Sequence, residues 1–94
     1  MIEGLKKHRE KILEMTKELG ISQIRVFGSA LGANFAPESD IDFLVKIPSG
    51  TTLFRLLNLV NRLEGLLGRK VDLLDEEEIS PYIRRKILKE ASPL

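Results

Sequence analysis

The chain has 94 residues, which predicts one small domain over residues 1–94 and leaves no room for a second. Lys and Arg together number 15 and Asp and Glu 14, and this near-balance argues against a generally basic nucleic-acid-binding protein. The sequence has no Cys and a single His, His8, which excludes a disulfide framework, a thiolate metal site and a His-rich metal site.

The first half of the chain predicts a helix, a strand, a loop and a second strand. Apolar residues spaced by three, four and seven predict one helix over 2–19, which Gly20 ends. The β-branched run 21–27 predicts a strand, and 41–47 predicts another. Between them, the Gly, Asn, Pro and Ser residues of 32–39 predict a loop.

The second half adds a helix, a strand and a last helix. A threonine cap precedes a leucine-rich amphipathic helix over 53–67. The run 71–74 predicts a third strand, and Ser80-Pro81 marks the start of a helix that stops near Ser92-Pro93. The order α-β-β-α-β-α predicts an α/β (α+β) domain in which helices pack on a small mixed β-sheet.

Two aspartates stand out at the start of the second strand. Alternate side chains of a strand share a face, so Asp40 and Asp42 project together while Ile41 and Phe43 point into a core. Two neighbouring carboxylates repel each other, and a divalent cation such as Mg²⁺ between them makes the arrangement favourable. The simpler interpretation is that Asp40 caps a turn and Asp42 is solvated on an edge strand.

Gly28 and Ser29 follow the first strand directly. Glycine permits close approach of a phosphate, and Ser29 offers a hydroxyl and an N–H group at a predicted helix start. An ordinary strand-to-helix turn explains the same two residues. Combined with Asp40 and Asp42, however, they form a phosphate cradle that faces a metal site, as nucleotidyl transfer from a Mg²⁺-bound triphosphate requires.

The segment Gly28-Ser29, ten further residues and Asp40-Ile41-Asp42 resembles the signature of the polymerase-beta-like nucleotidyltransferase superfamily. The whole stretch from residue 27 to 45 is similar to the minimal nucleotidyltransferases, the MNT family, whose domain has about the length of this chain. The resemblance implies the polymerase-beta-like fold and these site residues: Asp40, Asp42 and Asp72 as catalytic carboxylates and ligands of two Mg²⁺ ions, and Gly28 and Ser29 as the groups that bind the phosphates of ATP.

Asp72 fills the position of the third carboxylate of the family, on the strand over 71–74. Strand alternation agrees, since Val71 and Leu73 would face the core and Asp72 the metal side. Asp75 is the rival, but it alternates out of phase with Asp72. A solvated strand residue remains the other interpretation of Asp72.

One feature departs from the family pattern. Many active relatives carry basic residues just after the Gly-Ser pair, whereas residues 30–35 contain no Arg or Lys. A cation there would help to hold the triphosphate. The candidates to replace it are Arg25, Lys46, Arg69 and Lys70.

The chain lacks a separate domain to hold an acceptor, so we expect a second protein, or a second copy of the chain, to supply it. The resemblance implies a HEPN-domain toxin as partner and the transfer of AMP to one of its tyrosines, with this chain as antitoxin. The alternative is a module that keeps the fold and neutralises its partner by contact alone. The basic residues of the last helix form a solvated face or a contact for nucleotide phosphates, RNA or protein: Arg84, Arg85, Lys86 and Lys89.

The sequence also bears on location. No apolar stretch reaches the length of a membrane span, and residues 1–8 lack the apolar core of a signal peptide. We therefore expect a cytoplasmic protein without a membrane partner. Nothing in the composition indicates direct binding to nucleic acid.

Overall fold

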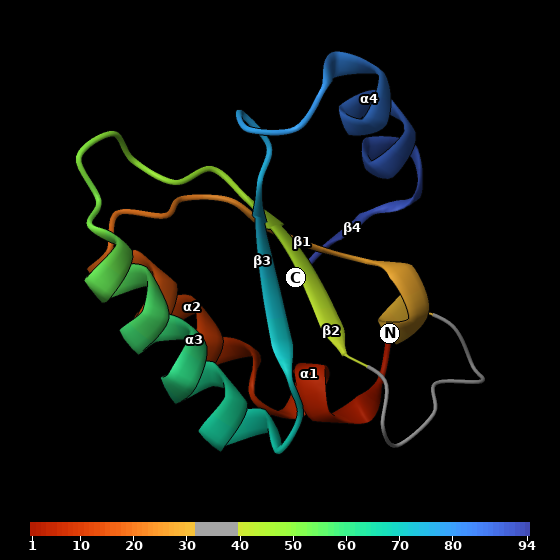
Figure 1. Cartoon of the computed structure of the whole chain (residues 1–94). Helices are drawn as coiled ribbons and strands as arrows, with labels where there is room; N and C mark the ends of the chain where they lie inside the picture. Colours follow the sequence, from red (N-terminus) through yellow and green to blue (C-terminus); the bar gives the residue numbers. More distant parts are fainter. Residues whose placement is uncertain (32–39) are drawn as a thin grey trace.

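A computed structural model describes residues 1–31 and 40–94, without the side chain of Ser29 (Figure 1). The loop predicted over 32–39 lies outside these residues. The elements of the described chain follow in this order: α1 Glu3–Lys7, α2 Arg9–Glu18, β1 Ile24–Phe27, the 3₁₀ helix η1 Gly28–Leu31, β2 Ile41–Val45, α3 Leu53–Leu67, β3 Val71–Asp75, α4 Pro81–Glu90 and β4 Ser92–Pro93.

The N-terminal helix is broken where the sequence predicts one continuous helix over 2–19. His8 ends α1 with φ −101° and ψ 13°, and α2 begins directly after it. The break lets Leu5 and Ile12 both reach the core at 0% exposure while the Ile2 N–H donates to the Ala30 carbonyl. The spacing of the apolar residues continues across the break, so the sequence pattern does not indicate that the helix is interrupted at His8.

The strands form one mixed sheet in the order β3-β2-β1-β4. β2 runs parallel to β3 and antiparallel to β1, and β1 also pairs antiparallel with β4. The mixed sheet is as predicted, but β1 and β2 are shorter than the runs 21–27 and 41–47, and β4 is an addition. Its residues Ser92 and Pro93 become a strand only because the edge of β1 lies beside them.

The helices before β3 cover one face of the sheet. Leu5 and Ile12 from the N-terminal helices and Leu59 and Leu63 from α3 belong to one buried core cluster with alternate residues of the strands, such as Phe43. α3 starts at the predicted threonine cap, where the Thr52 hydroxyl oxygen accepts a bond from the Arg55 N–H at 3.2 Å, and it ends at Gly68, which takes φ 67°. This face is therefore structural, and the opposite face is left for a site.

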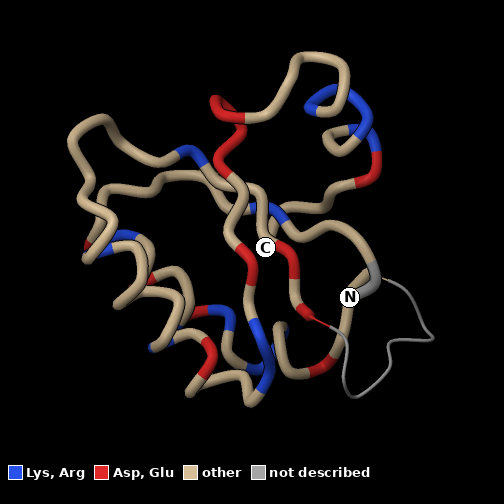
Figure 2. Tube along the Cα trace, viewed as in Figure 1, with Lys and Arg blue, Asp and Glu red and all other residues tan. Residues whose placement is uncertain are grey.

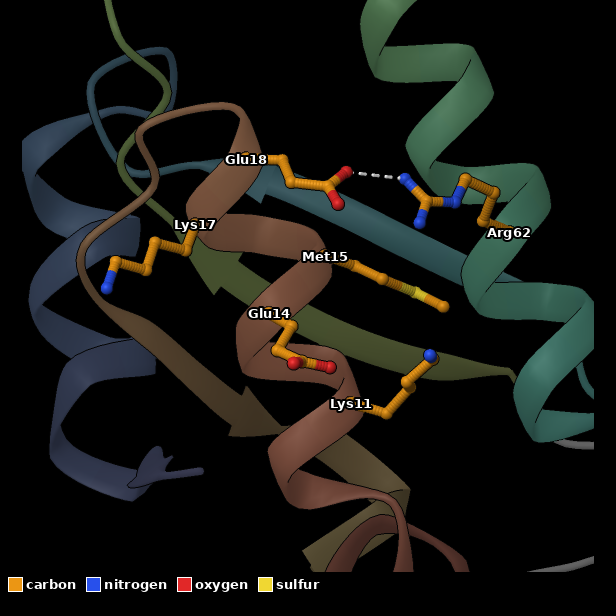
Figure 3. Close-up of a pocket in the computed structure, with 6 residues that line it drawn as sticks. All are labelled: Lys11, Glu14, Met15, Lys17, Glu18 and Arg62. Atoms are coloured by element: carbon orange, nitrogen blue, oxygen red, sulfur yellow. Dashed lines mark hydrogen bonds and ion pairs between the residues drawn. The ribbon is translucent and has the colours of Figure 1, made fainter.

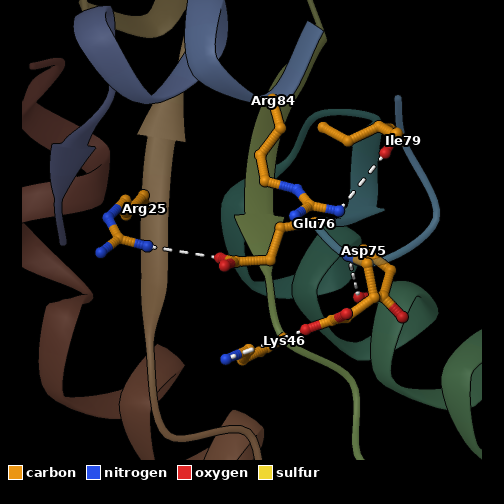
Figure 4. A network of polar contacts seen from close by, with 7 residues as sticks. Arg25, Lys46, Asp75, Glu76, Ile79 and Arg84 are labelled. Carbon is orange, nitrogen blue, oxygen red and sulfur yellow. Dashed lines mark hydrogen bonds and ion pairs between the residues drawn. The ribbon is translucent and has the colours of Figure 1, made fainter. Parts of the chain in front are cut away.

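That opposite face carries α4. Leu44 points there, since its neighbours Phe43 and Val45 belong to the core cluster and it does not. Leu44 is nevertheless fully buried, and α4 lies on its side of the sheet, with α2 and α3 behind (Figure 4). α4 starts as predicted at the Ser80 cap, but none of its residues is fully buried.

None of the helices in the described part of the chain is long and apolar enough to cross a membrane.

Candidate active site

Asp42 and Asp72 lie directly opposite each other on the neighbouring parallel strands β2 and β3. Residues paired across strands point to the same face, which here is the face of Leu44 and α4. Figure 2 shows the acidic stretches of β2 and β3 side by side in the middle of the molecule. Two of the predicted carboxylates, far apart in the sequence, are thus adjacent in space.

Asp40 stands one position before β2 and is exposed. It is two residues from Asp42 and is close enough to act on the Asp42 carboxylate electrostatically. Asp75, the rival candidate, pairs with Val45 of the core cluster and so lies on the opposite face. Its carboxylate accepts a bond from the Glu77 N–H at 3.0 Å, which stabilises the turn after β3.

Gly28 holds the backbone at the end of β1 close to Asp42. Its φ is +75°, a left-handed conformation that favours glycine. A Cβ atom at this position would stand 2.7 Å from Asp42 Oδ2, closer than any real contact allows. In the structure, the space that glycine leaves open is therefore filled by the carboxylate of Asp42.

The carboxylates leave this face with more negative charge than it can easily hold. Burial raises the pKa of the Asp42 carboxyl above its ordinary value, and the negative charges of Asp72 and Asp40 raise that pKa further. A hydrogen bond between the Asp42 and Asp72 side chains also favours the protonated form of Asp42. The charged form of Asp42 is thus destabilised in the protein without metal.

The donor set fits a hard divalent cation. Mg²⁺ binds carboxylate oxygens and keeps further positions for water and phosphate. A cation beside Asp42 and Asp72 would remove the repulsion that raises the pKa of Asp42. Within residues 1–31 and 40–94, however, no three acidic, His or Cys side chains converge tightly enough to hold an ion. The structure thus brings together two candidate ligands, Asp42 and Asp72, and leaves Asp40 next to them.

The predicted phosphate-binding pair is described only in part. Gly28 and Ser29 begin η1, a 3₁₀ helix of four residues, at the place where the sequence predicts a helix start. A helix this short offers little of the dipole that attracts anions. The side chain of Ser29 and the loop 32–39 lie outside the described part of the chain.

A hollow of about 460 Å³ lies on the other side of the molecule, between α2 and α3 (Figure 3). Its lining mixes charges of both signs, and the pair Arg62–Glu18 crosses it at 2.7 Å. It contains neither the paired aspartates nor a residue that the sequence singles out. We therefore place the site at the carboxylates of β2 and β3.

An ion pair between Arg25 and Glu76 lies near the carboxylates. Arg25 lies opposite Leu44, two residue pairs along from Asp42, and its Nη1 lies 3.4 Å from Oε2 of Glu76 (Figure 4). Arg25 is one of four cations that the sequence leaves open, whereas Glu76 is not predicted. Only the register of the strands distinguishes Arg25 from the other three.

Comparisons with known proteins show what this chain is similar to. The family model described as "Polymerase beta, Nucleotidyltransferase" matches residues 10–94. A Methanocaldococcus jannaschii protein, provisionally named protein adenylyltransferase MJ0435, is 35% identical over 88% of this chain and 89% of its own. Protein adenylyltransferase MntA of Thermococcus cleftensis is 32% identical over 82% of this chain and 78% of its own.

Solved structures share the fold. One that is provisionally described as a minimal nucleotidyltransferase superposes with a TM-score of 0.86 at 39% identity, over 98% of this chain and 94% of its own. A second is the tri-AMPylated Shewanella oneidensis HEPN toxin in complex with MNT antitoxin, with a TM-score of 0.68. At 20% identity, over 94% of this chain and 69% of that one, it shows likeness of fold alone.

Proposed function

The chain belongs to the polymerase beta nucleotidyltransferase family, and we propose that it transfers AMP from ATP to a hydroxyl group of a protein partner. The single observation that carries this proposal is the register of β2 and β3, which sets Asp42 opposite Asp72. The names of the Methanocaldococcus and Thermococcus relatives, both protein adenylyltransferases, support AMP as the group transferred and protein as the acceptor.

In the proposed reaction, the acceptor oxygen attacks the α-phosphorus of ATP. The new O–P bond forms as the bond to the bridging oxygen of the β-phosphate breaks, and pyrophosphate leaves. Asp72 assists removal of the hydroxyl proton, and Asp72 and Asp42, with Asp40 beside them, would hold Mg²⁺. Bound there, the cation would offset charge on the phosphates and activate the attacking hydroxyl. Gly28 keeps Asp42 in position, since any side chain at residue 28 would displace that carboxylate.

We further propose that the acceptor is a tyrosine of a HEPN-domain protein, so that this chain acts as an antitoxin. The fold that it shares with the complex of HEPN toxin and MNT antitoxin supports this partner. Exposed apolar side chains support a protein partner as well, because water-facing groups of this size favour burial in an interface. They are Leu53, Phe54 and Leu57 on α3 and Tyr82 and Ile83 on α4.

A contact-only module is the second candidate. The observation that favours it is the absence of Arg and Lys from residues 30–35, where the resemblance to the MNT family leads us to expect a cation for the triphosphate. Such a module would keep the fold and neutralise its partner without ATP. It predicts that loss of a carboxylate leaves neutralisation intact.

One experiment tests both candidates. The purified chain is mixed with a HEPN-domain partner, Mg²⁺ and ATP labelled at the α-phosphate, and label on the partner and survival of its toxic activity are measured together. Label on the partner that disappears with Asp42→Asn or with EDTA is the result expected of the enzyme. No label with the wild-type chain, together with neutralisation by Asp42→Asn, would leave the contact-only module.

A further inference from the structure

On the face that carries the carboxylates, we propose that Arg25 binds a phosphate of the nucleotide and leaves Glu76 to do so. This inference rests on the proposed function, since it assigns a cation to the same site. Because residues 30–35 contain no Arg or Lys, another residue has to supply the positive charge for the phosphates. Four cations are candidates, and the register of the sheet distinguishes them.

Arg25 is the candidate that lies within the sheet on the carboxylate face. On β1, Phe27 pairs with Asp42 and Arg25 pairs with Leu44, so the side chains of Arg25 and Asp42 point to one face. Diagonal neighbours of this kind have their Cβ atoms roughly 7–8 Å apart, within reach of a long side chain. A phosphate held beside Asp42 is thus within reach of the Arg25 guanidinium.

The other candidates lie outside the strands. Lys46 follows β2, is 55% exposed and lies 3.8 Å from Glu77 across an ion pair. Arg69 and Lys70 precede β3, and Lys70 is exposed. Arg25, by contrast, has a side chain only 28% exposed. It lies over the sheet in a defined position, which costs less conformational entropy on binding than ordering an exposed lysine.

The present partner of Arg25 holds it loosely. The contact from Arg25 Nη1 to Glu76 Oε2 is 3.4 Å, whereas Arg62 and Glu18 on the helices approach to 2.7 Å. Strong charge-assisted bonds between nitrogen and oxygen measure about 2.7–2.9 Å. A phosphate offers Arg a bidentate, negatively charged partner, and it can displace a carboxylate that is bound at this distance.

Glu76 needs a replacement partner when Arg25 leaves, because its side chain is only 14% exposed and a buried carboxylate without a cation is costly. Arg84 can serve. It extends from α4 toward Glu76 (Figure 4), and its buried Nε has no hydrogen-bond partner within the described chain. Its Nη2 makes only a long bond of 3.5 Å to the Ile79 carbonyl.

The cluster therefore contains two guanidinium groups and one carboxylate. The cluster itself thus carries one positive charge in surplus, beside the carboxylates where the nucleotide is expected to bind. In the nucleotide-free protein Glu76 takes up Arg25 and keeps it from the carboxylates of the site. When the nucleotide binds, Arg25 turns to a phosphate and Arg84 pairs with Glu76 in its place.

The test compares the affinity of the full chain for Mg²⁺-ATP across four variants, measured by calorimetry. Arg25→Ala should raise the Kd about tenfold or more, as loss of a hydrogen bond to a charged group does. Arg25→Lys keeps the charge and should lie between Arg25→Ala and wild type. Glu76→Gln removes the competing carboxylate and should lower the Kd. Arg62→Ala also removes an arginine from an ion pair with a glutamate, but on the helical face, and should leave the Kd unchanged.

The direction of the Glu76→Gln effect separates ligand binding from a structural ion pair. If the ion pair is merely structural, Arg25→Ala and Glu76→Gln should both lower the midpoint of thermal unfolding and leave the Kd for Mg²⁺-ATP at the wild-type value. If the wild-type chain binds Mg²⁺-ATP and Arg25→Ala and Arg25→Lys bind it equally well, the inference is wrong and the proposed function stands. If the wild-type chain neither binds Mg²⁺-ATP nor transfers AMP, the proposed function is wrong, and the inference with it.

Discussion

The Asp42 carboxylate lies against Gly28, where a side chain as small as a methyl group would meet Asp42 Oδ2 at 2.7 Å. The glycine thus permits two things at once: the left-handed turn at the end of β1, with φ +75°, and the position of a carboxylate on the next strand. The backbone of one strand end and the acid of its neighbour fit together as one unit.

Gly28→Ala should therefore lower both stability and nucleotide binding. The left-handed backbone costs a residue with a Cβ about 1–2 kcal/mol, and the displaced carboxylate adds to that. The Asp42 carboxylate would have to shift from its place opposite Asp72, so Mg²⁺-ATP should bind much more weakly. Chemical denaturation gives the first effect, and calorimetry gives the second.

Gly68→Ala is the matched control. Gly68 also has a left-handed φ, +67°, but among the described residues no atom beyond its own chain neighbours lies within 4 Å of the place where its Cβ would stand. It should show the backbone cost alone and keep wild-type affinity for Mg²⁺-ATP. Equal loss of free energy of unfolding in the two variants, with equal affinity, would contradict the role that we give to the contact between Gly28 and Asp42.

Asp42→Asn should abolish AMP transfer without harming the fold. A neutral amide binds Mg²⁺ weakly, so the rate should fall by several powers of ten, each about 1.4 kcal/mol of barrier. Without metal, the midpoint of thermal unfolding should stay level or rise, because repulsion with Asp72 and Asp40 is relieved. Asp40→Asn and Asp72→Asn should behave alike.

Asp75→Asn provides the control for that series. Asp75 lies on the opposite face of the sheet, where its carboxylate accepts the Glu77 N–H. The amide oxygen of Asn can accept the same bond, so transfer of AMP should stay near the wild-type rate. A loss as deep as that of Asp42→Asn would mean that the third carboxylate has been assigned to the wrong residue of β3.

The sequence predicts this face of the sheet but not its register. Alternation alone places Asp40 and Asp42 on one side and separates Asp72 from Asp75, because the period of a strand is two. That Asp42 stands opposite Asp72 depends on the parallel pairing of β2 with β3, which no local pattern specifies. The same applies to Arg25, which local sequence cannot single out among four candidates.

Other features depend on tertiary contacts that a linear pattern does not contain. The helix break at His8 leaves the apolar spacing unchanged, and Ser92 and Pro93 form a strand only beside β1. Gly28 has a recognisable sequence signal, but the group that lies against it in this structure is the Asp42 carboxylate. The sequence therefore predicts the glycine at the turn, but not that the Asp42 carboxylate lies against it.

Phe54→Ser should weaken binding to the partner and leave the fold intact. Phe54 is 81% exposed on α3, so its replacement should change the free energy of unfolding by no more than about 0.5 kcal/mol. An exposed aromatic ring often carries much of the energy of an interface. Asn58→Ser, one helical turn further along α3 and also exposed, is the matched control. Unchanged affinity of Phe54→Ser for a HEPN-domain partner would exclude this part of α3 from the interface.

The metal-free protein should gain stability as the pH falls through the raised pKa of Asp42. Burial and the charges of Asp72 and Asp40 raise this pKa in the folded state above its value in the unfolded chain. Between the two values the folded protein holds more protons than the unfolded chain, so stability decreases as pH rises. The penalty is complete above the folded pKa and absent below the unfolded one.

Asp42→Asn isolates this contribution, because the variant has no proton to bind at residue 42. The difference in free energy of unfolding between wild type and variant, measured in EDTA by urea denaturation, should shift in favour of wild type as the pH is lowered across that window. Mg²⁺ competes with the proton, so binding of Mg²⁺-ATP by the wild-type chain should weaken over the same range. A difference that stays constant with pH would show that Asp42 titrates alike in the folded and unfolded states, and would contradict its raised pKa.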